Sequence, residues 1–160
     1  EMIEKANANL AESGEKNIEF RLGEIENLPV ESGSIDVAIS NCVLNLVPDK
    51  HKAFAEILRI LKPGGHFCVS DIVIQGDMPE KLKSIAELYA GCVSGAISKI
   101  DYLNIIRSTG FVNVNIKSEK EYHIPDTVLS GYLGKEELES FRQSGIKILS
   151  ITVVAHKSNG

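Results

Sequence analysis

The run from Ser34 to Val73, SIDVAISNCVLNLVPDKHKAFAEILRILKPGGHFCVSDIV, constrains the fold more than any other part of the chain. Its apolar residues predict a strand through Val37, Ala38 and Ile39 and a second strand through Phe67–Val73. The first of these runs is typical of a strand that is buried on both faces of a parallel sheet. Between them, apolar residues recur at helical spacing and predict a helix that Asp49 caps and Pro63-Gly64-Gly65 ends. Strand, helix and strand in this order form a right-handed βαβ unit, which indicates an α/β fold.

The rest of the chain alternates between predicted helices and predicted strands. Caps, glycine stops and apolar periodicity place these elements. We expect helices over Glu1–Leu10, after Asp77, from Ser98 to Gly110 and over Lys135–Gln143, and strands over Asn17–Leu22, Phe111–Ile124 and Ile146–Ala155. Because no repeat or linker interrupts this order, we expect residues 1–160 to form a single domain.

Composition excludes several classes of partner and site. The net charge is −5 and no basic block occurs, so we expect no nucleic-acid partner. No apolar run approaches the roughly 20 residues of a membrane span, so we expect no membrane partner. The three cysteines are far apart, and neither CxxC nor HExxH occurs, which argues against a disulfide framework and a zinc site. Reduced thiols are typical of a cytoplasmic protein.

The end of the first central strand is the first candidate site. Ligands of open α/β sheets bind beyond the carboxyl ends of the strands. Asn41 and Cys42 follow one such strand, and Asp71 lies near the end of the next. The alternative is that Asn41 only turns the chain and that Cys42 is a small buried apolar residue, as free cysteines often are.

The segment GCVSGA is the second candidate. It places Cys92 among small residues between Gly91 and Gly95, where glycine weakens a helix. Small residues let a ligand or another backbone come close, so the segment suits either a binding site or tight helix packing with Cys92 as a filler.

Several stretches resemble a known family. The motif RILKPGG followed by a strand is similar to that of seven-stranded S-adenosylmethionine-dependent methyltransferases. A closer resemblance, over about residues 1–124, is to arsenite methyltransferases. The segments that carry it are EMIEKANANL, NIEFRLGEIENLPV, SNCVLNLVPDK and LYAGCVSGAISKIDYLNIIRSTGF.

The resemblance implies a Rossmann-like α/β sheet with strand order 3-2-1-4-5-7-6 and helices on both faces. This chain would supply strands 3 to 7 with their flanking helices, as a truncated methyltransferase sheet. Strands 1 and 2 and the glycine-rich cofactor loop are not among its 160 residues, so we expect the C-terminal portion of a methyltransferase domain. We also expect strand 4 to pair directly with strand 3, or to be covered by another chain in a homo-oligomer.

The same resemblance implies a site. S-adenosylmethionine would be the cofactor, with Glu24 and Ile25 flanking its adenine and Asn41 lining its pocket. Cys92 would be the catalytic thiolate and the ligand of trivalent arsenic, a soft ion that selects thiolates. Cys42 would be either a second substrate ligand or a wall of the cofactor pocket, and we favour the wall.

Three functional interpretations follow from these residues. The first is an S-adenosylmethionine-dependent methyltransferase that acts on cysteine-bound arsenite. The second is a methyltransferase of a small organic molecule, because no cysteine follows Cys92 where arsenic-binding relatives are expected to have one. The third is an inactive fragment that does not bind the cofactor on its own.

Overall fold

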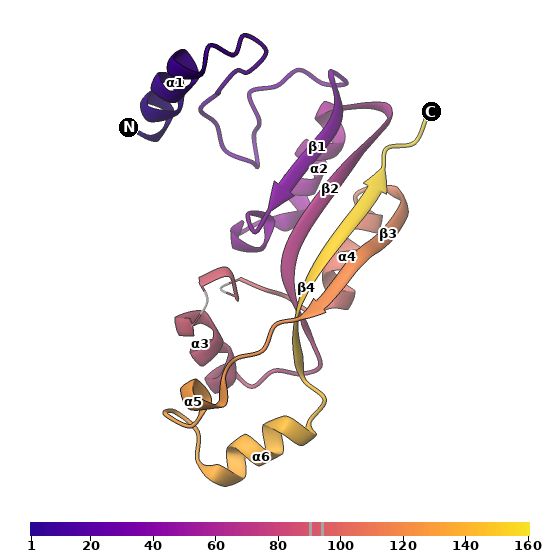
Figure 1. The fold of residues 1–160 in the computed structure, drawn as a ribbon. Helices are drawn as coiled ribbons and strands as arrows, with labels where there is room; N and C mark the ends of the chain where they lie inside the picture. Colours follow the sequence, from indigo (N-terminus) through magenta and orange to yellow (C-terminus); the bar gives the residue numbers. More distant parts are fainter. Residues whose placement is uncertain (90, 94) are drawn as a thin grey trace.

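Strand β2 (Leu61–Gln75) is central to the four-stranded sheet seen in a computed structural model of the chain (Figure 1). The strand order is β1-β2-β4-β3, with β1 (Ile35–Asn41), β4 (Lys147–His156) and β3 (Val112–Glu121). β1 is parallel to β2, whereas β4 is antiparallel to both β2 and β3. This order is the 4-5-7-6 part of the sheet that the resemblance implies, so the Rossmann-like fold class is confirmed.

The structure describes the backbone of residues 1–89, 91–93 and 95–160, and the side chains of these residues except 87–89 and 92. Six α-helices and two 3₁₀ helices lie in the described ranges. They are α1 (Met2–Ser13), η1 (Leu44–Leu46), α2 (Lys50–Ile60), α3 (Glu80–Tyr89), η2 (Gly91–Val93), α4 (Lys99–Ser108), α5 (Asp126–Leu129) and α6 (Lys135–Gln143). None of the helices in these ranges is long and apolar enough to cross a membrane.

Caps at the helix starts lie where the sequence predicts them. The Asp49 carboxylate accepts a hydrogen bond from the backbone N–H of Lys52, and Ser98 caps α4 through the N–H of Asp101. These side chains satisfy backbone donors that the first helical turn leaves free. Because capping depends only on nearby residues, these two starts could be predicted locally.

The end of α2 differs from the prediction. The helix stops at Ile60, before Pro63-Gly64-Gly65, and Leu61 is already extended. Proline disfavours a helical conformation at the residue that precedes it. The three residues instead form an irregularity within β2, where the register with β1 shifts. A Cβ on Gly65 would lie 2.9 Å from the carbonyl oxygens of Asp36 and Lys62, so this close approach of backbones requires glycine.

The main core lies between the sheet and helices α2 and α4. Phe54 of α2 is fully buried, and its ring centre lies 5.6 Å from those of both Phe67 and Tyr102. Phe111 packs edge-on against Phe67, with ring centres 4.7 Å apart. A smaller core joins the lower end of β2 and β4 to α3, around Ile72, Ile74 and Ile148. The apolar stripe of α2 is therefore buried as predicted.

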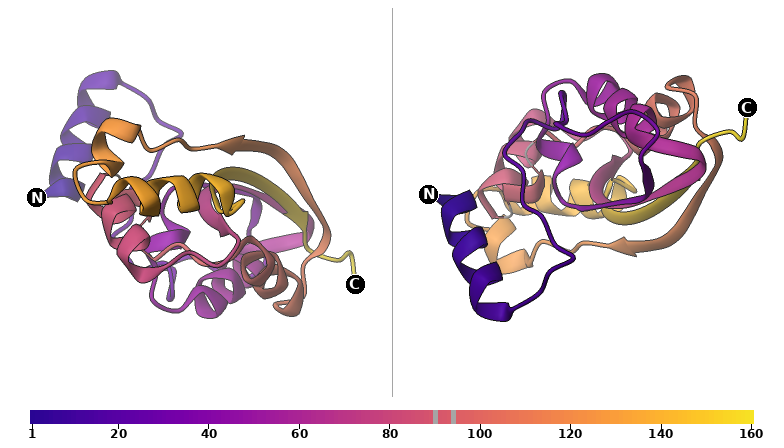
Figure 2. Two further views of the ribbon diagram at one scale, coloured as in Figure 1. Left: turned by 90° about the horizontal axis from the view of Figure 1, so that it is seen from below. Right: turned by 90° about the horizontal axis from the view of Figure 1, so that it is seen from above.

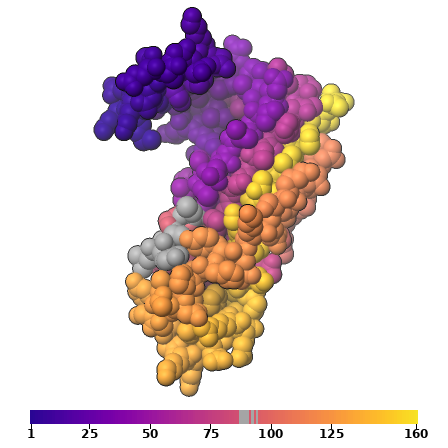
Figure 3. Space-filling view, in the orientation of Figure 1, coloured from indigo at the N-terminus to yellow at the C-terminus, as the bar shows by residue number. Residues whose placement is uncertain are grey.

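The opposite face of the upper sheet is not covered by a described helix, and its strands lie side by side at the surface (Figure 3). Val37 is 45% exposed and Ile39 is 81% exposed. The prediction that β1 is buried on both faces is therefore wrong for this chain. The outer edge of β1 is also unpaired within the described residues.

The strand predicted over Asn17–Leu22 is absent, so the expected direct pairing of strands 3 and 4 is wrong. The segment has no strand assignment, and Ile18, Phe20 and Leu22 are exposed. Alternation of apolar residues does not make a strand without a neighbour to share its hydrogen bonds. Helix α1, which has no buried residue, stands apart from the sheet at the end of this segment (Figure 2). Pairing of the β1 edge with another chain, and a single domain over residues 1–160, stay predictions.

Replacing Phe54 by alanine should destabilise the fold by about 3–5 kcal/mol, because it removes a ring that three other rings surround. Urea unfolding at fixed pH measures this loss. Ile100→Ala, at an exposed position of α4, is the control and should change stability by no more than about 0.5 kcal/mol. Equal losses in the two variants would contradict the buried position of Phe54.

Candidate functional site

The chain turns sharply where β1 ends. Asn41 is exposed, and the half-buried Cys42 that follows has φ 54°, in the left-handed region. The Cys42 N–H donates to the Ser70 carbonyl at 2.8 Å, which continues the β1–β2 ladder by one bond. A left-handed conformation costs a non-glycine residue about 1–2 kcal/mol. This turn directs the chain from the sheet into η1, beyond the carboxyl ends of both strands.

A buried acid lies beside this turn. Asp71 of β2 is 1% exposed, and the Tyr102 hydroxyl of α4 donates to its carboxylate at 2.6 Å. Burial raises the pKa of Asp71 from an ordinary value of 3.8 to about 6. The Tyr102 bond, the Asn45 backbone amide and the Lys50 charge act in the opposite direction. Burial and the Asp71 charge together raise the pKa of Tyr102, which also interacts electrostatically with Cys42.

Lys50 ties the loop after Cys42 to this acid. Its ammonium group donates to the carbonyls of Asn45, at 3.0 Å, and Val47, at 3.1 Å. Burial lowers the pKa of Lys50, whereas the nearby Asp71 charge opposes that change. A buried charge needs such partners, because leaving it unpaired in the interior is costly. The loop is therefore held by buried polar contacts at the carboxyl ends of β1 and β2.

The Cys92 segment lies against the same loop. η2 contacts both η1 and β2. A Cβ on Gly95 would lie 2.3 Å from the Asn45 carbonyl oxygen, and Gly95 has φ 74°, so only glycine suits this position. Gly95 thus serves close backbone packing, whereas a Cβ on Gly91 would meet nothing within 4 Å. The Cys92 backbone belongs to η2, but its side chain lies outside the described residues.

A pocket of about 280 Å³ lies on the helix side of β1. Its walls include Ile25, Leu28, Val30, Ala38, Ser40 and Ile57. The structure therefore brings the predicted cofactor residue Ile25 together with the end of β1. Glu24 is exposed and forms an isolated bridge with Asn27, and neither Glu24 nor Asn41 lines this pocket.

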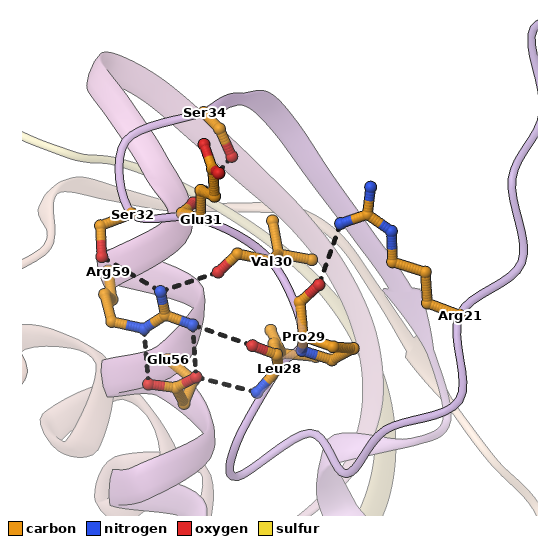
Figure 4. A network of polar contacts seen from close by, with 9 residues as sticks. All are labelled: Arg21, Leu28, Pro29, Val30, Glu31, Ser32, Ser34, Glu56 and Arg59. Atoms are coloured by element: carbon orange, nitrogen blue, oxygen red, sulfur yellow. Dashed lines mark hydrogen bonds and ion pairs between the residues drawn. The ribbon is translucent and has the colours of Figure 1, made fainter.

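An arginine of α2 anchors the loop that carries Ile25. The Arg59 guanidinium makes two hydrogen bonds to Glu56, each 2.8 Å, and donates to the carbonyls of Leu28 and Val30 (Figure 4). Glu56 in turn accepts the Leu28 N–H at 2.9 Å. Charge-assisted bonds of this bidentate kind are stronger than neutral ones. Since the loop has no helix or strand of its own, these bonds largely determine where it lies.

A second anchor joins the same loop to the helix start. Glu26 accepts the backbone N–H of Asp49 at 2.9 Å. Neither Glu26 nor Arg59 is distinguishable from a surface residue in the sequence, because the backbone groups that they bind lie 23 to 31 positions away. The same holds for Tyr102, whose spacing predicts only an apolar stripe. These supporting residues were missed for that reason.

The described residues include no group of three or more histidine, cysteine, aspartate or glutamate side chains that could hold a metal ion. Cys68 is half-buried in β2 opposite Val154, on the open face of the sheet. Neither Cys42 nor Cys68 forms a disulfide. Cys42 begins the loop between β1 and α2, and the backbone of η2, which includes residue 92, contacts that loop, whereas Cys68 lies within the sheet.

Residues 1–123 match the family described as a methyltransferase domain. The chain is 41% identical, over 121 residues, to an arsenite methyltransferase of Halobacterium salinarum, covering 76% of this chain and 31% of that protein. It is 47% identical over 64 residues to a demethylmenaquinone methyltransferase of Lactococcus lactis, covering 40% of this chain and 25% of that protein. The chain thus spans well under half the length of these curated relatives.

A solved structure carries the same similarity. It is CrArsM, an arsenic(III) S-adenosylmethionine methyltransferase from Chlamydomonas reinhardtii. The TM-score is 0.69 at 33% sequence identity, and the match covers 86% of this chain and 44% of the other. The YcgJ protein of Bacillus subtilis, with a TM-score of 0.74 at 19% identity, is similar in fold alone.

The raised pKa of Asp71 predicts a specific pH dependence. The charged Asp71 carboxylate is disfavoured in the folded state, so the contribution of Asp71 to the stability of the folded state falls as pH rises from about 4 to about 6. The stability of the native chain relative to an Asp71→Asn variant should therefore fall by about 2 kcal/mol between pH 4 and pH 7. Urea unfolding of both proteins at each pH measures this difference.

Tyr102→Phe provides the matched test of the same acid. It removes the hydrogen bond that lowers the pKa of Asp71, so the loss of stability should extend to higher pH than in the native chain. If the Asp71→Asn variant and the native chain have parallel stability profiles, Asp71 does not titrate as the structure indicates.

Proposed function

The chain belongs to the methyltransferase-domain family, and from that premise we propose that the protein transfers a methyl group from S-adenosylmethionine to trivalent arsenic. The meeting of the Cys92 segment with the loop after β1 is the observation that carries this proposal. This contact supports the proposal because α/β sheets bind their ligands beyond the carboxyl ends of the strands, and the loop after β1 begins at such an end. The arsenite methyltransferases among the relatives support the same substrate.

The residues present fit one part of the cofactor. The pocket at Ile25 and Ser40 has mainly apolar walls, which suits the face of an adenine ring. Arg59, Glu56 and Glu26 would position the loop that supplies Ile25, and Asn41 would add a polar group at the end of β1. The glycine-rich loop that such cofactors need for their methionine end is not among these 160 residues.

When bound, S-adenosylmethionine supplies an electrophilic methyl group on a sulfonium. The Cys92 thiolate would hold arsenic(III), and the arsenic lone pair would be the nucleophile toward that methyl group. No proton moves in this displacement, so the protein contributes alignment rather than acid–base groups. Close packing of Gly95 on Asn45 would orient the Cys92 segment for that alignment.

Methyl transfer to a small organic molecule is the second candidate. Two observations favour it: no cysteine follows Cys92 in the chain, and the demethylmenaquinone methyltransferase is 47% identical over the region it shares. In that case Cys92 would pack without binding substrate, and the Asp71–Tyr102 pair would lie near a different acceptor. The match to a methyltransferase domain disfavours the third reading, an inactive fragment. A cytoplasmic location stays part of the proposal.

One measurement distinguishes the two candidate functions. It uses the protein that contains this chain together with a cofactor loop. With arsenite and S-adenosylmethionine, Cys92→Ser should lower methylated arsenic by at least about 100-fold, because the hydroxyl is a poor ligand for soft arsenic. Cys68→Ser, within the sheet, is the control and should retain activity. Arsenite methylation that survives Cys92→Ser would exclude the proposed substrate role.

Substitution of Arg59, which holds the loop that carries Ile25, should weaken cofactor binding. Arg59→Lys keeps the charge but loses the bidentate geometry, so the loop should be less well positioned. We expect the KM for S-adenosylmethionine to rise about 3–10-fold with kcat little changed, which is a loss of about 1 kcal/mol of binding. Arg107→Lys, at an exposed position of α4, is the control. An unchanged KM in the Arg59 variant would mean that this loop does not contribute to cofactor binding.

A further inference from the structure

Two histidines face each other across the open side of the sheet. His66 near the start of the regular part of β2 is the register partner of His156 at the end of β4. Their ring centres lie 5.3 Å apart, and the ring planes are inclined by 33°. Val37 of β1 is paired with His66 and Val112 of β3 with His156, and both valines are partly exposed. The pair therefore lies in a row of side chains that no described helix covers (Figures 1 and 3).

The hydrogen bonding of this pair is incomplete. Nδ1 of His156 is buried and has no hydrogen-bond partner among the residues that the structure describes. Leaving such a polar atom unsatisfied costs about 1–3 kcal/mol. The neighbouring cations are engaged elsewhere, since Lys62 bonds to Asp36 and Lys157 donates to the carbonyls of Leu58 and Leu61. Among the described residues, the ion pair of a histidine with a carboxylate involves His123 and not His66 or His156.

The separation of the rings matches that of two imidazoles on one metal ion. A zinc–nitrogen bond is about 2.0–2.1 Å, so two imidazoles bound at a tetrahedral angle have ring centres roughly 5 Å apart. The observed 5.3 Å is close to this separation. Imidazole is also a common ligand for zinc, nickel and copper.

We propose that His66 and His156 together bind a divalent transition-metal ion, which links β2 to β4 on the open face of the sheet. Water completes the coordination, because no third histidine, cysteine or carboxylate in the described ranges joins the pair at ligand distance. Cys68, two residues along β2, is excluded by the same observation. With two protein ligands the site is modest in affinity and suits a labile ion rather than a permanent structural one.

This site is separate from the candidate methyltransferase site. Asn41, Cys42 and Asp71 lie at the carboxyl ends of β1 and β2, whereas His66 lies toward the opposite end of the sheet. The inference therefore does not depend on the proposed function. An ion held by both strands stabilises the folded state over the unfolded one, in which the two histidines are 90 positions apart.

Thermal unfolding of the full chain with increasing Zn²⁺ tests the site. We expect the melting temperature of the native chain to rise with zinc, with an apparent Kd between about 1 μM and 1 mM. His66→Gln and His156→Gln should each weaken that response at least about tenfold, because each leaves one protein ligand. His51→Gln, at an exposed position of α2, is the control and should retain the native response.

Copper binding can be measured by a signal that does not depend on the stability of a variant. With one equivalent of Cu²⁺, the electron paramagnetic resonance spectrum of the native chain should show two nitrogens bound to copper. The spectrum of His66→Gln or of His156→Gln should show one bound nitrogen. Each variant is first shown to be folded by its cooperative melting without metal. The proposal is overturned if zinc has no effect up to about 1 mM, if either glutamine variant responds like the native chain, or if His51→Gln abolishes the response.

Discussion

The pairing of β2 on both of its edges is the constraint on which the rest of this structure depends. Its parallel ladder with β1 and its antiparallel ladder with β4 satisfy the backbone polar groups of a strand whose core face carries Phe67, Val69 and Val73. Helices α2 and α4 then bury that face. Because the two ladders fix the direction of every neighbouring strand, they also fix which loops meet beyond the strand ends.

The loops at those ends are held by polar contacts rather than by regular structure. Asp71 and Tyr102 join β2 to α4, and Lys50 holds the turn that follows Cys42. Arg59 and Glu56 hold the segment before β1 in the same way. In a low-dielectric interior such bonds are strong when complete and costly when broken. The candidate site is thus supported by residues that do not themselves line it.

The two faces of the sheet have different roles in this chain. One face is packed against helices and carries the candidate pocket at its β1 edge. The other exposes Val37 and Ile39 and carries the histidine pair. Exposed apolar side chains beside an unpaired strand edge favour association with further protein.

The sequence by itself determined the features that depend on near neighbours. The caps at Asp49 and Ser98, the bounds of α6 and the strands that flank α2 were all predicted, because capping and periodicity act within about four residues. The resemblance added the strand order, which periodicity alone does not contain.

Only the tertiary structure decided what depends on distant partners. Residues Asn17–Leu22 alternate like a strand but have no neighbour to pair with. The sequence around Gly95 suggests room for a ligand, but Gly95 packs on the Asn45 backbone. The spacing of Tyr102 predicts a core residue, but its hydroxyl donates a hydrogen bond to Asp71. His66 packs beside His156, which lies near the far end of the chain. In each case the deciding contact joins residues that are far apart in sequence, so its free energy is absent from any local pattern.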